Sequence, residues 1–320
     1  MNNYLIREMQ ESDIPQAIKI WVEQNKLYCS DNMVFPGYWR DNTNGIAGYL
    51  NRRVQSGTAV VIELDNRVIG YQGYEEFPFN GEKSAFCPVV LHAVVEEYKE
   101  EAYTLLYKYV SQRWVLKNIL NHMWIINFND LKLRNILYDL GFGSYLIDAF
   151  ACTAGYTLHC NESYVVKRAG EKDKGDLYDL IEESREYYSS APLFLRRDQY
   201  SMEEVESFIK GGNLFIAWDK EMAIGFINVS VSQDKNIIEM WTENCGLIDE
   251  IGAYIKPQYR GKGIGKELLK NVFDFCKSNS IQSIHVDYET ANIFANKFWK
   301  KYFRPMLLSV RRTINKNIND

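Results

Sequence analysis

The sequence predicts a protein of the α/β class, of the α+β kind, built from two tandem domains. Segments of the first half recur in the second half at a nearly constant spacing. Each half also reads as the same series of elements: strand, helix, helix, hairpin, long strand, helix, strand, helix, strand. The chain has 320 residues and 46% hydrophobic content, which is enough for two domains with separate cores.

The opening elements of the two halves match. Residues 4–7 read as a strand, and Ser12 and Asp13 then cap a helix. Residues 164–167 begin the same pattern again. The matched pairs, all at an offset of 160 residues, are Tyr4 with Tyr164, Glu11 with Glu171 and Asp13 with Asp173.

Two further matches follow in the same order. Residues 57–71 and 212–226 each read as a β-hairpin that turns at a short polar loop, at an offset of 155. At an offset of 161, residues 98–99 match 259–260 and residues 138–142 match 299–303. Three matches in one order indicate an internal duplication.

The boundary between the copies is predicted in a turn-rich segment at residues 155–162. We therefore expect two domains, residues 1–158 and residues 159–320. The last residues, 315–320, are polar and expected to fray.

A glycine-rich turn stands out in the second copy. Residues 247–255 read as one strand, and Pro257 ends its hydrogen-bond ladder. Apolar residues then recur at helical spacing, which predicts a helix beginning near Lys262. Glycines in such a turn allow positive φ and close approach, so that backbone N–H groups at the positive end of the helix can hold a diphosphate. The three glycines are Gly261, Gly263 and Gly265.

The spacing of these glycines differs from the dinucleotide fingerprint and from the nucleotide-triphosphate loop. It matches R/Q-x-x-G-x-G/A, read at Arg260, Gly263 and Gly265, and here the chain resembles the GNAT N-acetyltransferase superfamily. The resemblance covers the second copy closely and the first weakly. It implies domains with a mixed, mostly antiparallel central sheet flanked by helices, and acetyl-CoA as co-substrate without a metal. The residues that it implies for CoA binding are Ala253, Tyr254, Ile255, Arg260, Gly261, Lys262, Gly263, Ile264, Gly265, Lys266 and Asn292.

Acetyl transfer to an amine needs a base, because alkyl amines have a pKa near ~10.4. Glu250 is the predicted base: it precedes the glycine loop, and a carboxylate in that region serves several enzymes of the family that the sequence resembles. The alternatives are Asp249, Glu243 and Glu239.

The family's tyrosine that protonates the leaving thiolate belongs to the pattern N-x-x-A-x-x-L-Y-x-x-x-G-F, which begins here at Asn292. Trp299 stands at the tyrosine position, and an indole is a hydrogen-bond donor that cannot act as an acid near neutral pH. We expect either Tyr302 or Tyr288 to replace it, or the thiolate to leave unassisted, since thiols have a pKa near ~8.5.

The first copy lacks the glycine loop. Its equivalent segment, residues 98–103, contains no glycine and places Glu100 and Glu101 where the diphosphate would lie. Side chains with Cβ resist positive φ. We therefore expect this degenerate copy to bind no CoA and to act as a scaffold for the second.

Composition narrows the class of protein. A net charge of −5 argues against nucleic acid as the main partner. No apolar run approaches ~18 residues and the first residues do not resemble a signal peptide, so we expect a cytoplasmic protein without a membrane partner. Four histidines without metal-ligand spacing and six cysteines without a C-x-x-C pair predict no metal and reduced thiols.

The predicted function is N-acetylation of an amine on a small molecule or peptide, by a monomer or homodimer. The alternative is a non-catalytic acyl-CoA sensor, in which the missing tyrosine marks lost catalysis and the first domain binds a partner. The acceptor stays open, because Tyr187, Tyr188, Phe194, Arg196 and Arg197 suit several classes of amine equally.

Overall fold

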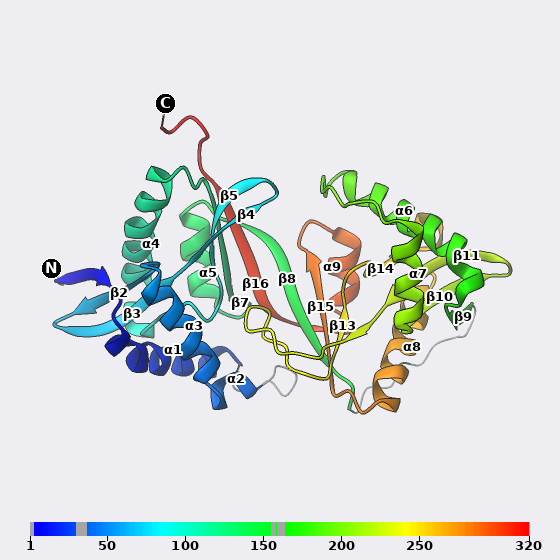
Figure 1. The fold of residues 1–320 in the computed structure, drawn as a ribbon, viewed down its shortest axis with the longest axis horizontal. Coiled ribbons are helices and arrows are strands. Elements are labelled where there is room, and N and C mark those ends of the chain that lie inside the picture. The colour runs from blue at the N-terminus through cyan, green and yellow to red at the C-terminus, as the bar shows by residue number, and fades with distance from the viewer. Residues whose placement is uncertain (1–2, 30–36, 155–157, 159–163, 320) are drawn as a thin grey trace. The chain divides into compact units, whose positions relative to one another are not determined.

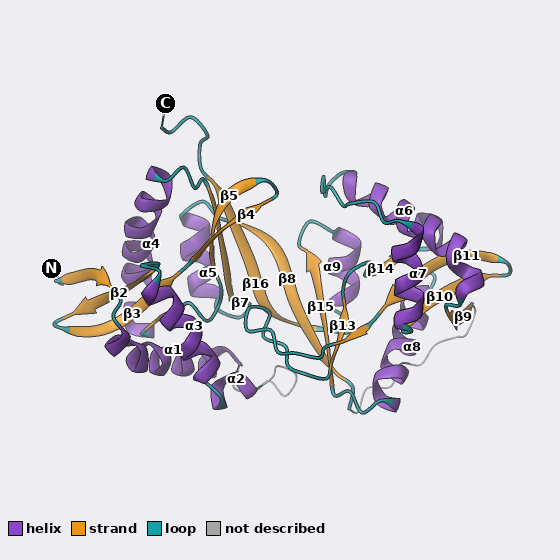
Figure 2. Cartoon of the chain, viewed as in Figure 1, coloured by secondary structure: helices purple, strands orange, loops and turns teal. Residues whose placement is uncertain are grey.

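The computed structural model describes residues 3–29, 37–154, 158 and 164–319 (Figure 1). The chain forms two compact units of helices and strands (Figure 2). The first unit is drawn from Met1–Asp148, Asn236–Met240 and Pro305–Asp320, and the second from Ala149–Lys235 and Trp241–Arg304.

The first unit begins with a four-stranded sheet in the order β1-β2-β3-β6. A second group of strands has the order β4-β5-β7-β16-β8, in which β5 and β7 are parallel and β16 and β7 antiparallel. The elements are β1 (Tyr4–Glu8), α1 (Ile14–Cys29), α2 (Tyr38–Asp41), α3 (Asn44–Gln55), β2 (Ala59–Leu64), β3 (Arg67–Gly73), β4 (Glu75–Phe79), β5 (Glu82–Cys87), β6 (His92–Val94), α4 (Lys99–Leu116), β7 (Asn121–Asn127), α5 (Leu131–Asp139), β8 (Gly143–Cys152) and β16 (Arg304–Thr313).

The second unit repeats this plan. Its four-stranded sheet has the order β9-β10-β11-β14, and a second group of strands has the order β8-β15-β13-β12. The elements are β9 (Val165–Arg168), α6 (Lys174–Ser189), α7 (Met202–Gly211), β10 (Leu214–Asp219), β11 (Met222–Asn228), β12 (Ser230–Val231), β13 (Cys245–Ile248), β14 (Ala253–Ile255), α8 (Ile264–Ser278), β15 (Ser283–Glu289) and α9 (Ile293–Trp299). The expected mixed, mostly antiparallel sheets flanked by helices are confirmed.

The irregularities of the two units also match. In the first hairpin the register of β2 and β3 shifts between Ile62 and Glu63, and in the second that of β10 and β11 shifts between Ala217 and Trp218. These bulges lie 155 residues apart, the spacing expected for the hairpins. Short 3-10 turns at Glu11–Asp13 and Glu171–Asp173 precede α1 and α6, at the predicted offset of 160.

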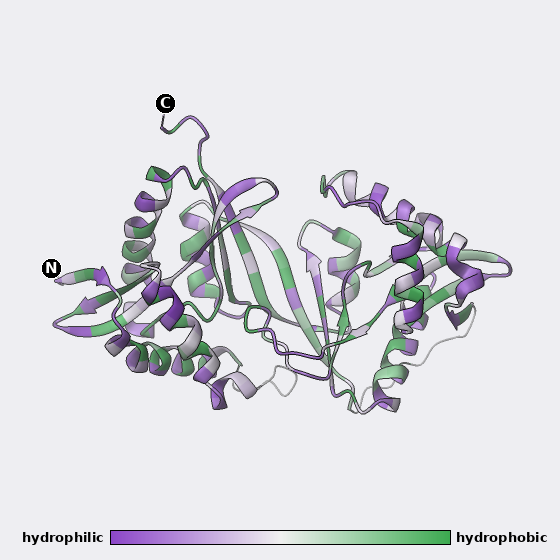
Figure 3. Cartoon of the chain, viewed as in Figure 1, coloured by the Kyte–Doolittle hydropathy of each residue, from purple (hydrophilic) through white to green (hydrophobic). Residues whose placement is uncertain are grey.

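Hydrophobic and hydrophilic residues alternate along the helices and strands, as the colouring of Figure 3 shows. In the second unit α6 and α7 pack against β10 and β11. The buried cluster between them is Leu177, Leu180, Ile181, Val205, Ile209, Leu214, Ile216, Ala223, Phe226, Ile251 and Tyr254. This core fixes the sheet edge on which the candidate site is built.

Each unit contains a strand from the other half of the sequence. In the first unit β16 pairs with β7, from Leu307 with Asn127 to Thr313 with Asn121. In the second unit the end of β8 lies beside β15, where the ring of Phe150 is 4.9 Å from that of His285. The compact units are therefore not two consecutive pieces of chain. The predicted boundary between residues 158 and 159 adjoins residues outside those described and remains a prediction.

The predicted strand at residues 247–255 is two strands in the structure. The chain turns between β13 and β14, where Glu250 and Gly252 have φ of +56° and +62°. β13 pairs in parallel with β15, whereas β14 pairs antiparallel with β11 in the other sheet. Gly252 thus lies in a turn that ends one strand and starts the next.

Candidate functional site

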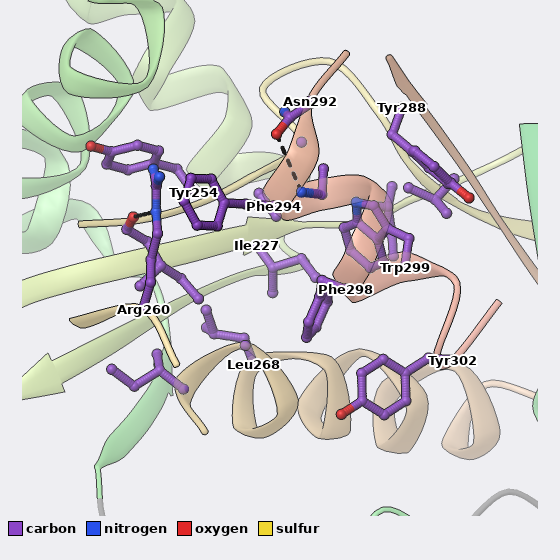
Figure 4. Close-up of a pocket in the computed structure, with 18 of the residues that line it drawn as sticks. Ile227, Tyr254, Arg260, Leu268, Tyr288, Asn292, Phe294, Phe298, Trp299 and Tyr302 are labelled. Atoms are coloured by element: carbon purple, nitrogen blue, oxygen red, sulfur yellow. Dashed lines mark hydrogen bonds between the residues drawn. The ribbon is translucent and has the colours of Figure 1, made fainter. Parts of the chain in front are cut away.

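A cavity of about 510 Å³ lies within the second unit, between the split strands, the start of α8 and α9 (Figure 4). It brings together all of the predicted site residues except Lys262. Those that line it are Glu250, Ala253, Tyr254, Ile255, Arg260, Gly261, Gly263, Ile264, Gly265, Lys266, Tyr288, Asn292 and Tyr302. Asp249 also lines it, whereas Glu239 and Glu243 are not among its lining residues.

The glycine loop leaves open space at the start of α8. Gly261 and Gly263 have φ of +79° and +93°, and a Cβ added at either would meet nothing within 4 Å. Gly263 is the N-cap of α8, so the helix begins at Ile264, two residues later than predicted. The N–H groups of a first helical turn have no intrahelical acceptors. The loop therefore has the room, conformation and donors to hold a diphosphate.

Gly265 has a different role from its two neighbours. A Cβ at this position would lie 2.9 Å from a ring carbon of Phe298 and 3.3 Å from a methyl carbon of Ile255. The absence of a side chain thus lets α8 pack closely against α9 and β14. The sequence predicted one purpose for the three glycines, and the structure separates this packing glycine from the two that shape the loop.

The strand β14 presents a backbone edge to the cavity. One edge of β14 pairs with β11, from Gly225 with Ile255 to Ile227 with Ala253. β14 ends its sheet, so among the described strands none pairs with the other edge. Ala253, Tyr254 and Ile255 therefore have main-chain groups that an extended amide-bearing ligand can reach.

Arg260 joins the glycine loop to this edge. Its Nε donates to the carbonyl oxygen of Ile255 at 3.0 Å. The guanidinium lies 4.4 Å from the ring centroid of Tyr187 and 4.9 Å from that of Phe294 (Figure 4). Such cation–π contacts stabilise the positive charge while it is partly removed from water. The first residue of the motif thus holds the loop against β14.

Asn292 forms two hydrogen bonds in the wall of the cavity that contains the start of α9. Its buried side-chain oxygen accepts from the N–H of Ala295 at 3.2 Å, which caps α9 (Figure 4). The same oxygen accepts from the hydroxyl of Tyr187 at 3.1 Å. Asn292 therefore ties the start of α9 to the end of α6, a structural role beside its predicted contact with CoA.

Two neighbouring carboxylates lie at the turn after β13, in different surroundings. Asp249 is half-buried and accepts from the hydroxyl of Ser230 at 3.1 Å. Burial, with the nearby charge of Glu250, raises the pKa of Asp249 to about 6. Glu250 is exposed, and its Oε2 accepts from the side-chain amide of Asn228 at 3.4 Å. Of the predicted base and its alternatives, these surroundings favour Asp249, because burial brings its pKa close to neutrality.

Trp299, at the position where the family pattern has tyrosine, packs among the aromatic residues at and after the end of α9. Trp299 is buried, with ring centroids 4.9 Å from Phe298 and 5.3 Å from Phe303. This is the packing of a core residue. Tyr302 lies over Phe298 at 5.1 Å, and Tyr288 is buried on β15 (Figure 4). Both tyrosines line the cavity, and their acid role stays a prediction.

Sequence reasoning missed two acidic residues of the cavity, Asp287 and Glu289 on β15. They are two residues apart, so they share one face of the strand. Their spacing of two residues on a strand was the sequence feature that could have identified them. Which face of β15 borders the cavity, however, depends on the strand with which β15 pairs.

In the first unit, the position that corresponds to Arg260 holds a buried lysine that forms an internal ion pair. Lys99, the counterpart of Arg260, is fully buried, and its Nζ lies 2.9 Å from the buried carboxylate of Asp130. It also lies 4.5 Å from the ring centroid of Tyr28. Asp130 caps α5 by accepting from Leu133 N–H at 3.0 Å, as Asn292 caps α9. The cation, ring and cap thus recur in the first unit, but there an internal ion pair holds the cation.

Three further expectations concern a membrane-spanning helix, a metal site and the cysteines. None of the described helices combines the length and apolar character needed to cross a bilayer. No group of three or more potential ligands gathers as a metal site in the described part of the chain. Five of the six cysteines are free thiols, and Cys160 lies outside the described residues: the five are Cys29, Cys87, Cys152, Cys245 and Cys276.

Comparison with known proteins shows what this fold is similar to. Residues 176–303 match the model of the Acetyltransferase (GNAT) family. A GCN5-related N-acetyltransferase from Sphaerobacter thermophilus has a similar structure, with a TM-score of 0.58 and 12% identity over 98% of this chain and 96% of that one. Residues 176–303 are therefore similar to the GNAT family, and the two-unit fold as a whole is similar to that of a solved GCN5-related N-acetyltransferase.

A second solved structure is similar at a TM-score of 0.53 and 11% identity. It contains the GCN5-related glucosamine N-acetyltransferase region of a fungal multi-domain β-N-acetylglucosaminidase, and the match covers 97% of this chain and 38% of that one. Identities this low show the fold alone. No curated protein sequence matches the chain.

Proposed function

We propose that the second unit is an acetyl-CoA-dependent N-acetyltransferase that acts on an amine of a small molecule or peptide. The observation that carries this proposal is the single cavity that unites the open glycine loop, the edge of β14 and the carboxylate of Asp249. These are the parts that binding of a nucleotide thioester and deprotonation of an amine require.

The residues present fit acetyl-CoA as co-substrate. The open space beside Gly261 and Gly263 gives room for the diphosphate, and Arg260 and Lys266 supply positive charge in the same cavity. The edge of β14 can pair with the amides of the pantetheine arm. Bound there, acetyl-CoA supplies an activated acyl group for direct transfer to the acceptor.

Asp249 accepts the proton that the acceptor must lose. An alkyl ammonium is a poor nucleophile, and a base with a pKa of about 6 is ionised at pH 7 yet close enough to neutrality to take a proton through water. The new C–N bond forms as the C–S bond breaks, and the second nitrogen proton passes to the departing thiolate. Tyr302 or Tyr288 can relay that proton, because both line the cavity.

We propose further that the first copy of the repeat, residues 1–158, is a degenerate GNAT-like domain without CoA and that the second copy, residues 159–320, contains the acetyltransferase site. The buried pair of Lys99 and Asp130 supports this, since the cation equivalent to Arg260 is held inside the first unit. We also propose a cytoplasmic monomer or homodimer.

The test is release of free thiol from acetyl-CoA across a panel of amines, with the Asp249→Asn protein beside the parent. Amine-dependent release that falls in the variant supports the enzyme. Acetyl-CoA binding by calorimetry without release for any amine would favour a non-catalytic sensor, the function that Trp299 at the tyrosine position suggests.

A further inference from the structure

The cavity contains an arginine that the proposed reaction does not use, Arg197 in the loop after α6. Its meaning depends on where the acceptor enters, so this inference rests on the function proposed above. β14 runs from Ala253 to Ile255 and then into the glycine loop. A ligand held by the loop and extended along β14 reaches the turn at residues 249–252 with its reactive end, so the acceptor must approach at that turn.

Two tyrosines locate the guanidinium of Arg197 near this turn. It lies 3.4 Å from the ring centroid of Tyr188, which also lines the cavity. Burial raises the pKa of Tyr200, while the charge of Arg197 opposes that rise and the charge of Glu250 adds to it. Screening limits such effects to roughly 10 Å in 0.1 M salt. Because Arg197 and Glu250 act on one phenol, the guanidinium lies at the acceptor end of the cavity.

The loop that carries Arg197 is fastened to α6 on both sides of this residue. The N–H of Leu195 donates to the carbonyl oxygen of Tyr188 at 2.8 Å. The side-chain amide of Gln199 donates to the hydroxyl of Tyr178 at 3.0 Å. Both tyrosines belong to α6, and the ring of Tyr188 also covers the face of the guanidinium. These contacts hold the guanidinium in place before any ligand binds.

The edge of this guanidinium is open to a ligand. Arg197 is half-buried, and within the described part of the chain its guanidinium has no hydrogen bond and no ion pair. Stacking on a ring occupies the face of a guanidinium and leaves the N–H donors along its edge. Those donors form a rigid fork that matches the two oxygens of a carboxylate.

The net charge of the cavity does not select the acceptor, because four acidic and four basic side chains line it. Selection must come from individual groups. Arg260 and Lys266 are assigned above to the diphosphate, and Lys301 already has a partner in the chain. Arg197 is therefore the basic residue of the lining whose charge these assignments leave unused.

We propose that the acceptor is an amino acid whose carboxylate binds the edge of Arg197 while its amine lies at Asp249. Bidentate, charge-assisted hydrogen bonds fix orientation as well as adding affinity, so they would direct the amine toward the thioester. A carboxylate brings one negative charge, which one guanidinium matches. A phosphate would bring a second negative charge close to Glu250, which would repel it.

The test compares amino acids with their uncharged amides at three lengths: glycine, 4-aminobutanoate and 6-aminohexanoate, each beside its amide. Thiol release should give, at one length or more, a kcat/KM for the acid about tenfold above that for the amide, the effect of one charged hydrogen bond. Equal values, or a preference for the amide, at all three lengths would overturn the inference and leave the acetyltransferase function standing.

Arg197→Gln should lower the ratio of acid to amide in kcat/KM about tenfold, mainly through the KM of the acid. Comparing ratios between proteins cancels differences in amine pKa between acid and amide. The matched control is Arg196→Gln, because Arg196 is an exposed neighbour outside the lining, and it should keep the ratio of the parent. An unchanged ratio in Arg197→Gln, or an equal fall in both variants, would show that Arg197 does not hold the carboxylate.

Calorimetry separates this inference from the proposed reaction. The preferred amino acid is titrated into each protein in the presence of CoA, and acetyl-CoA is titrated into each protein alone. If no amine releases thiol, the proposed reaction fails, but binding of an amino acid that is lost in Arg197→Gln and kept in Arg196→Gln still supports the carboxylate site. If Arg197→Gln instead weakens acetyl-CoA binding and leaves the amino acid unaffected, Arg197 holds the cofactor and the inference is overturned.

Discussion

Replacement of Asp249 by Asn should change the pH dependence of acetyl transfer. With a pKa of about 6, the carboxylate is roughly 10% ionised at pH 5 and roughly 90% at pH 7. The kcat/KM of the parent should therefore rise about ninefold between these pH values and then level off. The variant loses the base, which costs on the order of 10²–10⁴ in rate at pH 7. Its rate should instead climb about tenfold per pH unit toward the pKa of the amine near ~10.4.

Glu250→Gln is the matched comparison, since it makes the same change from acid to amide one residue away. The charge of Glu250 raises the pKa of Asp249, so its removal should move the rise in kcat/KM to lower pH with little loss at pH 7. The assay is thiol release from pH 5 to 9 at constant ionic strength, with acetyl-CoA affinity measured by calorimetry as a control. A Glu250→Gln protein that loses the rise while Asp249→Asn keeps it would assign the base to Glu250 and refute the reasoning from burial.

Three further changes test the rest of the site. Gly263→Glu should abolish acetyl-CoA binding measured by calorimetry, because it adds a negative charge to the open loop and a Cβ at φ +93°, at a conformational cost of ~1–2 kcal/mol. Gly265→Ala should lower the free energy of unfolding by ~1–3 kcal/mol in a urea titration, because its Cβ would meet Phe298 at 2.9 Å, and an unchanged midpoint would count against close packing there. Asp130→Ala should destabilise the protein by ~3–5 kcal/mol, read from denaturation, because it removes both the buried carboxylate beside Lys99 and the cap of α5, and it leaves that lysine paired only with the exposed Glu96. In the parent, calorimetry should give one acetyl-CoA per chain, and a stoichiometry near two would show that the first unit binds as well.

The duplicated order of strands and helices could be predicted because it depends on patterns among neighbouring residues in the sequence. The strand, cap and helix at the start of each copy depend on neighbouring residues, and so do the hairpins. The bulges at Ile62 and Ala217 then fell at the predicted spacing of 155 residues. The glycine loop was equally local, since a strand, a turn and an amphipathic helix follow one another within about 25 residues.

Other features depend on contacts that no local pattern contains. The break at Glu250 requires a positive φ in a residue other than glycine, and it exists because β13 and β14 pair with different partners. The raised pKa of Asp249 comes from burial, which the assembled fold supplies. For the same reason, Asp287 and Glu289 were recognisable as site residues only once β15 was known to pair with β13.

The exchange of final strands limits how the two copies of the repeat could be separated. β16 completes the sheet of the first unit, and the end of β8 completes that of the second. A deletion that removed either copy would also remove a strand from the remaining one. The fold of each unit therefore requires a strand from the other copy, whatever either copy binds.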